Sequence, residues 1–235
     1  MKLQDIKTFY ICPDNAAYQG RRQHMERLLK DLGIADVTHK KTAGRGANVD
    51  LIDATVEILE SVADDTPVLI LEDDVNVDLN NGCCPDPSHE HRMLTNIYIP
   101  HAADAMYLGI SRAGGSFYNG FDNGPCEVEP YNAEMVRVKN MLSAHAILYL
   151  SARYKTDVVA RLRGLKDHNE KMNINQNLII KQLIEQGVLG NQEYYSDVVL
   201  SRLQPYYNIY AYKRPLFYQW AALGGKEADT RFVLE

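Results

Sequence analysis

The sequence predicts one α/β domain in which helices flank a mixed, mostly parallel β-sheet. Three observations lead to this prediction. Residues 7–33 follow the order strand, turn, helix, glycine, which is typical of α/β units. The apolar run 68–71 has the composition of a strand that is covered on both faces. Strand and helix patterns then continue without a linker or repeat, so we expect residues 1–235 to form a single domain.

The elements are predicted from the spacing of apolar residues and from the turn residues between them. Period-two or continuous apolar runs indicate strands, and apolar residues three and four apart indicate helices. Gly33 and Pro67 end the first two helical patterns. The patterns predict strands at 7–12, 37–41, 68–71, 105–110, 146–150, 209–212 and 216–218, and helices at 16–32, 51–63, 151–165 and 178–184. The stretches 80–100 and 111–130 are expected to be mainly loops.

Composition excludes several classes of protein. The chain has 235 residues, 31 acidic against 25 basic, and 46% of its residues are apolar, so it can bury a core. A net charge of -6 argues against a surface that grips phosphate backbones throughout. No apolar run approaches the ~20 residues of a membrane span, and the N-terminus is too polar for a secretory signal. We therefore expect a cytoplasmic protein with no membrane span, whose four cysteines are reduced.

Three consecutive carboxylates, Glu72, Asp73 and Asp74, follow the apolar run 68–71. Their mutual repulsion at the end of a buried strand is unfavourable unless a cation offsets it. Mg²⁺ and Mn²⁺ prefer oxygen ligands and are often held by one or two carboxylates together with substrate phosphates. Because side chains alternate along extended chain, we expect Glu72 and Asp74 to hold the metal, and Asp73 to face a ribose hydroxyl or a nearby cation. A solvated turn or a helix cap is the alternative.

Four segments in order resemble glycosyltransferase family 25, the lipopolysaccharide and collagen galactosyltransferase type. The opening of the family is similar to FYICPDNAAYQGRRQHMERLLKDLGI, its carboxylate motif to VLILEDDV, its next strand to AMYLG, and a later segment to SAHAILYLS. The resemblance implies a GT-A-like fold and a metal-dependent transferase of carbohydrate biosynthesis, inverting, that uses Mn²⁺ or Mg²⁺. The donor would be a nucleoside-diphosphate sugar, with a UDP-sugar expected, and the acceptor a glycan or another hydroxyl.

The same resemblance assigns roles along the chain. Residues 1–110 would form the nucleotide-binding half and residues 111–235 the acceptor-side half. The nucleotide contacts would come from the first strand, its turn, the arginine pair and the acidic motif: Tyr10, Ile11, Pro13, Arg21, Arg22 and Asp73. A solvated helix face is the alternative for the two arginines.

The catalytic base is less clear, because the chain departs from the family pattern. Members carry Pro-x-Asp near the start of a late helix, whereas the matching segment here is Asn173-Ile174-Asn175, in which an amide cannot act as a base. Nearby polar residues are therefore the candidates, namely Asp167, His168 and Glu170. His145 takes the family-like histidine position, as a catalytic group or as a structural histidine under the site. The family's Gly-Cys-x-x-Ser-His segment is also replaced here, at 46–51.

Other interpretations stay open at this point. The lost motifs also fit a catalytically degenerate module that binds sugars or nucleotides, and the acidic triplet also occurs in metal-dependent phosphoryl-transfer or hydrolytic enzymes. A zinc site at 83–91 is disfavoured, because adjacent cysteines lack the usual ligand spacing. Tyrosines crowd the last 45 residues beside several basic residues, which leaves a nucleic acid acceptor possible. The oligomeric state is not predicted.

Overall fold

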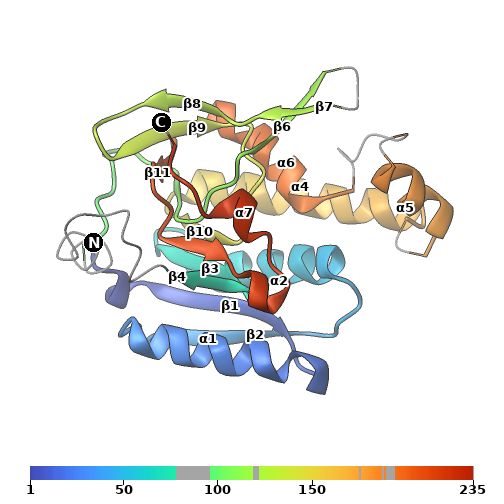
Figure 1. Ribbon diagram of the computed structural model, residues 1–235, viewed down its shortest axis with the longest axis horizontal. Helices are drawn as coiled ribbons and strands as arrows, with labels where there is room; N and C mark the ends of the chain where they lie inside the picture. Colours follow the sequence, from blue (N-terminus) through green and yellow to red (C-terminus); the bar gives the residue numbers. More distant parts are fainter. Residues whose placement is uncertain (78–95, 119–121, 175, 187, 189–193, 235) are drawn as a thin grey trace.

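The computed structural model describes residues 1–77, 96–118, 122–174, 176–186, 188 and 194–234 (Figure 1). The segment 83–91, which was considered as a zinc site, and Asn175 lie outside the described residues. The helices are α1 (Gln19–Asp31), α2 (Ala47–Ser61), α4 (Ala152–Lys171), α5 (Leu178–Glu185), α6 (Ser196–Leu203) and α7 (Glu227–Thr230), with short 3₁₀ turns at Leu3–Asp5, Ala16–Tyr18, Gln204–Tyr206 and Ala221–Leu223.

The main sheet of the described chain has eight strands in the order β2-β1-β3-β10-β5-β11-β9-β8. They are β1 (Lys7–Pro13), β2 (Val37–Thr42), β3 (Val68–Glu72), β5 (Ala105–Tyr107), β8 (Glu127–Pro130), β9 (Met135–Lys139), β10 (Ala146–Tyr149) and β11 (Ile209–Tyr212). Two small antiparallel pairs stand beside it: β4 (Val75–Val77) with β12 (Phe217–Gln219), and β6 (Ala113–Tyr118) with β7 (Asp122–Pro125).

The sheet is mixed, as predicted, but parallel neighbours do not dominate it. Strands β10 and β9 run against the other six, so only three of the seven described pairings are parallel: β1 with β2, β1 with β3, and β5 with β11. These two strands make four of the seven pairings antiparallel, because each of them lies between two strands that run in the opposite direction. The α/β class is confirmed, and the expectation of a mostly parallel sheet is corrected in this detail.

Helices cover both faces of the sheet. On one face, α2, α4 and α6 bury Ile58, Leu162 and Leu200 against strand residues that include Ile70. On the other face, α1 buries Met25, Leu28 and Leu29 next to β4 and β12. Figure 1 shows α1 and α4 on opposite sides of strands β1 and β3. Because β3 is covered on both faces, its continuous apolar sequence has no polar side to present.

Most predicted elements in the first half of the chain are confirmed, but the short strand β4 was missed and α2 begins at 47 rather than at the predicted 51. The stretch 111–130, where a loop was predicted, contains β6, β7 and β8, because these short strands lack a strong apolar pattern; β9, which follows at 135–139, was not predicted. Helix α6 was also missed, and α4 continues six residues beyond the predicted end at 165. Within the described part of the chain, no helix combines the length and apolar character needed to cross a membrane.

Candidate active site

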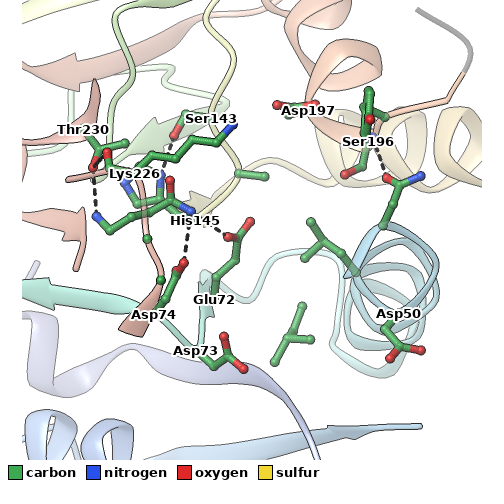
Figure 2. A pocket seen from close by; sticks show the side chains of 18 of the residues that line it. Asp50, Glu72, Asp73, Asp74, Ser143, His145, Ser196, Asp197, Lys226 and Thr230 are labelled. Atoms are coloured by element: carbon green, nitrogen blue, oxygen red, sulfur yellow. Dashed lines mark hydrogen bonds between the residues drawn. The ribbon is translucent and has the colours of Figure 1, made fainter. Parts of the chain in front are cut away.

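A pocket of about 710 Å³ lies beyond the C-terminal ends of β1, β2 and β3 (Figure 2). In open α/β sheets, ligands bind at this edge. Its lining comes from both ends of the chain, with Ile11 and Pro13 on β1 and Gln219, Lys226 and Thr230 from the C-terminal segment. The pocket is large enough for a ligand of nucleotide-sugar size, because such sites typically measure about 300–1,000 Å³.

The side chains of the acidic triplet face two different partners. This agrees with the prediction that side chains alternate in direction along the segment. Gln219 Nε2 donates to Glu72 Oε2 over 3.2 Å and to Asp74 Oδ2 over 3.5 Å. Asp73 faces Arg21 instead, with 2.5 Å between Nη1 and Oδ1. The backbone is also fixed, because Glu72 N–H donates to His145 O at 2.9 Å and Asp74 O accepts from Trp220 N at 2.7 Å. The structure therefore brings Glu72 and Asp74 together on one side.

The electrostatics of the Glu72–Asp74 pair favour a positive partner. Burial raises the pKa of Glu72, and the neighbouring charge of Asp74 raises it further. Burial also raises the pKa of Asp74, with Asp73 adding to the effect. Within the described residues, Asp74 Oδ1 is buried and has no hydrogen-bond partner. Two carboxylates held together with one oxygen unsatisfied form an environment that a cation would relieve.

The donor set is that of a hard cation completed by its substrate. The described residues contain no group of three or more His, Cys, Asp or Glu side chains arranged to hold a metal. Zinc-type closed sites need about four protein ligands, so Glu72 and Asp74 do not fit one. They do fit Mg²⁺ or Mn²⁺, which are commonly held by one or two carboxylates together with substrate phosphates. The predicted pair, Glu72 and Asp74, is therefore chemically suited to such a cation.

Arg21 lies at the pocket wall, where it joins the two ends of the chain. Its guanidinium pairs with Asp73, donates to the carbonyl of Leu223, and lies over the Tyr18 ring at 5.4 Å from the centroid. Gly224 follows with φ 83°, and a Cβ there would lie 3.3 Å from Arg21 Nη2. A glycine therefore lets the C-terminal segment approach Arg21 closely.

Two of the predicted nucleotide contacts do not reach the pocket. Tyr10 points to the opposite face of β1, where it is buried and stacks on His39 with centroids 4.7 Å apart. Arg22 is the next residue after Arg21 on the helix and therefore faces another way. It donates to the carbonyls of Pro13 and Asn15, each at 2.7 Å, and so holds the turn after β1. Ile11, Pro13, Arg21 and Asp73 do line the pocket.

His145 is a buried histidine at the floor of the pocket. Its Nδ1 lies 3.0 Å from Ser143 Oγ, and its Nε2 lies 3.4 Å from the carbonyl of Phe217. Burial lowers the pKa of His145 to about 4, so the ring is neutral near pH 7. Gly109 packs directly on it, since a Cβ there would lie 2.0 Å from Nε2. Of the two roles predicted for His145, these contacts support the structural one.

The predicted base candidates on α4 lie away from the pocket. Asp167 and Glu170 are exposed on the outer side of this helix and do not line the pocket. The inner side of α4, including Leu162 and Leu165, packs into the core, and Asp167 and Glu170 lie two and five positions after Leu165, which turns both away from that side. His168 is also absent from the lining. These candidates are corrected by their placement, and we do not propose them further.

Asp197 is the carboxylate that sequence reasoning missed. It lies in the first turn of α6 and lines the pocket, and burial raises its pKa. Asn48 at the start of α2 fixes this turn, because its amide donates to Tyr194 O and its Oδ1 accepts from Ser196 N at 3.1 Å. The signal was the Ser-Asp pair before an apolar helical run, which is typical of a helix N-terminus. Figure 2 shows Asp197 across the pocket from Glu72.

Gln219 was also missed, and Lys226, which the sequence placed only among the basic residues of the tyrosine-rich end, lines the pocket with it. The charge of Lys226 acts on Asp197 by lowering its pKa, against the effect of burial. Lys226 follows two glycines, and Gly225 is tightly enclosed, since a Cβ there would lie 2.7 Å from the backbone of Gln219. A Gly-Gly-Lys turn was a visible signal in the sequence, but nothing local placed it opposite the acidic motif.

The tyrosines of the last 45 residues are mainly core residues. Tyr207, Tyr210, Tyr212 and Tyr218 are all at least nine-tenths buried. They pack in the two core clusters on either side of the sheet. Tyr206, at 77% exposure, is an exception. A continuous tyrosine platform for bases is therefore absent from the described part of this region.

The chain is distantly similar to a solved structure, while its sequence matches no known family. No family model matches the chain, and no curated protein matches it. A solved structure, described as that of a glycosyltransferase involved in the glycosylation of the major capsid of PBCV-1, is 8% identical with a TM-score of 0.35. The match covers 87% of this chain and 92% of that chain. A likeness this distant assigns neither family nor activity, and the resemblance to glycosyltransferase family 25 stays a prediction.

Proposed function

We propose that this protein is a metal-dependent glycosyltransferase that moves a sugar from a nucleoside-diphosphate sugar to a hydroxyl acceptor. The observation that carries the proposal is the Glu72–Asp74 pair at the C-terminal end of β3, in a pocket of about 710 Å³, where the buried Oδ1 of Asp74 has no hydrogen-bond partner within the described residues. Two cationic side chains, Arg21 and Lys226, line the same pocket. Carboxylates for a cation and basic groups for phosphates together match the charge pattern of a diphosphate bound with a divalent ion.

The donor would bind along the ends of β1 and β2. Ile11 and Pro13 give an apolar wall, and Thr42 contributes a hydroxyl that has no partner within the described residues. Arg21 and Lys226 are suited to hold the diphosphate oxygens. A Mn²⁺ or Mg²⁺ ion held by Glu72 and Asp74 would neutralise charge on the departing nucleoside diphosphate. A UDP-sugar remains the proposed donor.

Asp197 is the proposed general base. It is a pocket-lining carboxylate, and burial raises its pKa above the ordinary aspartate value, which makes it a stronger proton acceptor than an exposed aspartate. It would accept the proton of the acceptor hydroxyl as the sugar is transferred. The backbone N–H of Val198 and the charge of Lys226 act against the effect of burial and favour the ionised carboxylate that a base requires. A single displacement with inversion follows if Asp197 acts only as a base.

Thermal stabilisation by nucleotides tests this function. We expect UDP, tested beside GDP and CDP, to raise the melting temperature only when Mn²⁺ is present, and we expect Asp74→Asn to abolish that response while folding normally. A response to free sugars without metal would support a sugar-binding module instead. No nucleotide response from intact protein would sink the transferase proposal. A donor screen that detects nucleotide release, with water included as an acceptor, would then identify the sugar.

A further inference from the structure

Gln219 has a backbone that is fixed on both sides. It is the last residue of β12 and pairs with Val75 on β4, directly after the acidic triplet. Its N–H donates to Thr230 Oγ1 at 2.9 Å, and the next N–H, of Trp220, donates to Asp74 O at 2.7 Å. The side chain is therefore delivered to the acidic pair by a strand that is itself attached to the acidic segment.

The side-chain amide of Gln219 bridges the two carboxylates from a single nitrogen. Nε2 lies 3.2 Å from Glu72 Oε2 and 3.5 Å from Asp74 Oδ2, so one donor group faces oxygens of both residues. An amide offers only partial positive charge, and these distances are at the long end for hydrogen bonds. Asp74 is 7% exposed, and its other oxygen has no partner within the described residues. The amide thus stands where the two carboxylates converge without satisfying both.

We propose that Gln219 is a third oxygen ligand of the cation held by Glu72 and Asp74. This inference rests on the cation of the proposed function. Amide oxygens of Asn and Gln are normal ligands for hard cations. Rotation of the terminal amide by half a turn exchanges Oε1 with Nε2 without moving the backbone. Without the cation, the amide nitrogen faces the carboxylates, because they would repel the amide oxygen. With the cation bound, the amide oxygen would face the site instead.

The proposal explains why two carboxylates are enough in this pocket. A site searched only among acidic, histidine and cysteine side chains has fewer than three members in the described chain. The amide oxygen raises the protein's contribution to three, and substrate phosphates and water complete the coordination of Mg²⁺ or Mn²⁺. It also gives the C-terminal segment a direct role at the site, since this segment would close onto the cation through Gln219.

A competing explanation is that Gln219 is only a hydrogen-bond clamp. The two roles predict different changes in Mn²⁺ affinity for the same substitution. If Gln219 is a ligand, Gln219→Leu removes an oxygen and weakens Mn²⁺ binding. If Gln219 is only a clamp, the same change removes a donor that competes with the cation, so Mn²⁺ binding stays the same or becomes tighter. Gln219→Glu supplies a carboxylate oxygen at the same place and should tighten binding in the ligand case.

The experiment is a titration of the apoprotein with Mn²⁺, without nucleotide, by calorimetry and by the loss of the free-ion electron paramagnetic resonance signal. We expect Gln219→Leu to weaken Mn²⁺ binding about tenfold or more and Gln219→Glu to tighten it, by analogy with losses at other metal-supporting residues. The matched control is Asn76→Leu. Asn76 carries an amide on the paired strand β4, and it contacts Tyr218 Oη at 3.3 Å rather than the carboxylates. Melting curves of each apoprotein show that it is folded.

The outcomes separate this inference from the proposed function. Unchanged or tighter Mn²⁺ binding in Gln219→Leu overturns the ligand role, and Mn²⁺-dependent nucleotide binding by the wild type would still support a transferase. Equal losses in Gln219→Leu and Asn76→Leu overturn it as well, because the effect would then belong to the small sheet. Absence of Mn²⁺ binding by the wild-type protein overturns both the ligand role and the metal dependence.

Discussion

The two walls of the pocket have different origins. One wall comes from the N-terminal part of the chain, where β1, β3 and the acidic triplet follow each other closely in sequence and in the sheet. The other wall comes from Asp197, Gln219 and Lys226, which reach the acidic residues across more than 120 positions of sequence. The first wall would supply metal ligands and one phosphate contact. The second would supply the base, a further metal ligand and a basic side chain for the diphosphate. Neither wall is therefore sufficient for the reaction alone.

The largest expected effect comes from the second wall. Asp197→Asn removes the proposed base but keeps the shape of the side chain, so turnover should fall about 10²–10⁴-fold. Mn²⁺-dependent nucleotide binding, measured by thermal shift, should stay within a few-fold of the wild-type value. Equal loss of binding and turnover would show that Asp197 holds the donor instead, and unchanged turnover would remove it from the mechanism.

The floor that joins the two walls should be intolerant of added volume. A Cβ at Gly109 would lie 2.0 Å from His145 Nε2, so Gly109→Ala should reduce the free energy of unfolding by about 3 kcal/mol. The matched control is Gly164→Ala on α4, where a Cβ meets nothing within 4 Å and should stabilise the helix by about 0.5–1 kcal/mol. Urea denaturation measures both. Equal stability of the two variants would contradict the packing described for His145.

The acidic wall should make the apoprotein less stable as pH rises. Burial raises the pKa of Glu72 above its ordinary value, so the folded state keeps a proton that the unfolded state loses. Folded protein then binds more protons than unfolded protein between these two pKa values, and stability falls through that window. Glu72→Gln should therefore gain stability over the wild type from about pH 5 to about pH 8, by about 2–4 °C in melting temperature for each kcal/mol of stability that the wild type loses. A difference that does not change with pH would contradict the raised pKa.

The smallest effect is expected outside both walls. Asp167 and Glu170 are exposed on α4, so the double variant Asp167→Asn/Glu170→Gln should keep its turnover and change stability by less than about 0.5 kcal/mol per site. Steady-state kinetics beside Asp197→Asn make the comparison direct. A loss of turnover comparable to that of Asp197→Asn would restore the α4 residues as candidates for the base.

The same contrast between walls explains what could be predicted from the sequence. The first wall is encoded locally: an apolar run that ends in acids, and the turn after β1, can be recognised within a few residues. The side of β1 on which Tyr10 lies was missed, because the turn motif does not specify which alternate residues face the ligand. Asp197 and Gln219 were missed because their positions depend on long-range contacts, such as Asn48 with Ser196 and β12 with β4.

The most direct test of a cation-bridged diphosphate site is the coupling between metal and nucleotide. Mn²⁺ affinity is measured by calorimetry in the absence and presence of saturating UDP, and UDP affinity is measured with and without Mn²⁺. If Glu72 and Asp74 hold an ion that also contacts the diphosphate, each ligand should tighten the other by the same factor, about tenfold or more. Equal Mn²⁺ affinity with and without UDP, or equal UDP affinity with and without Mn²⁺, would contradict this site.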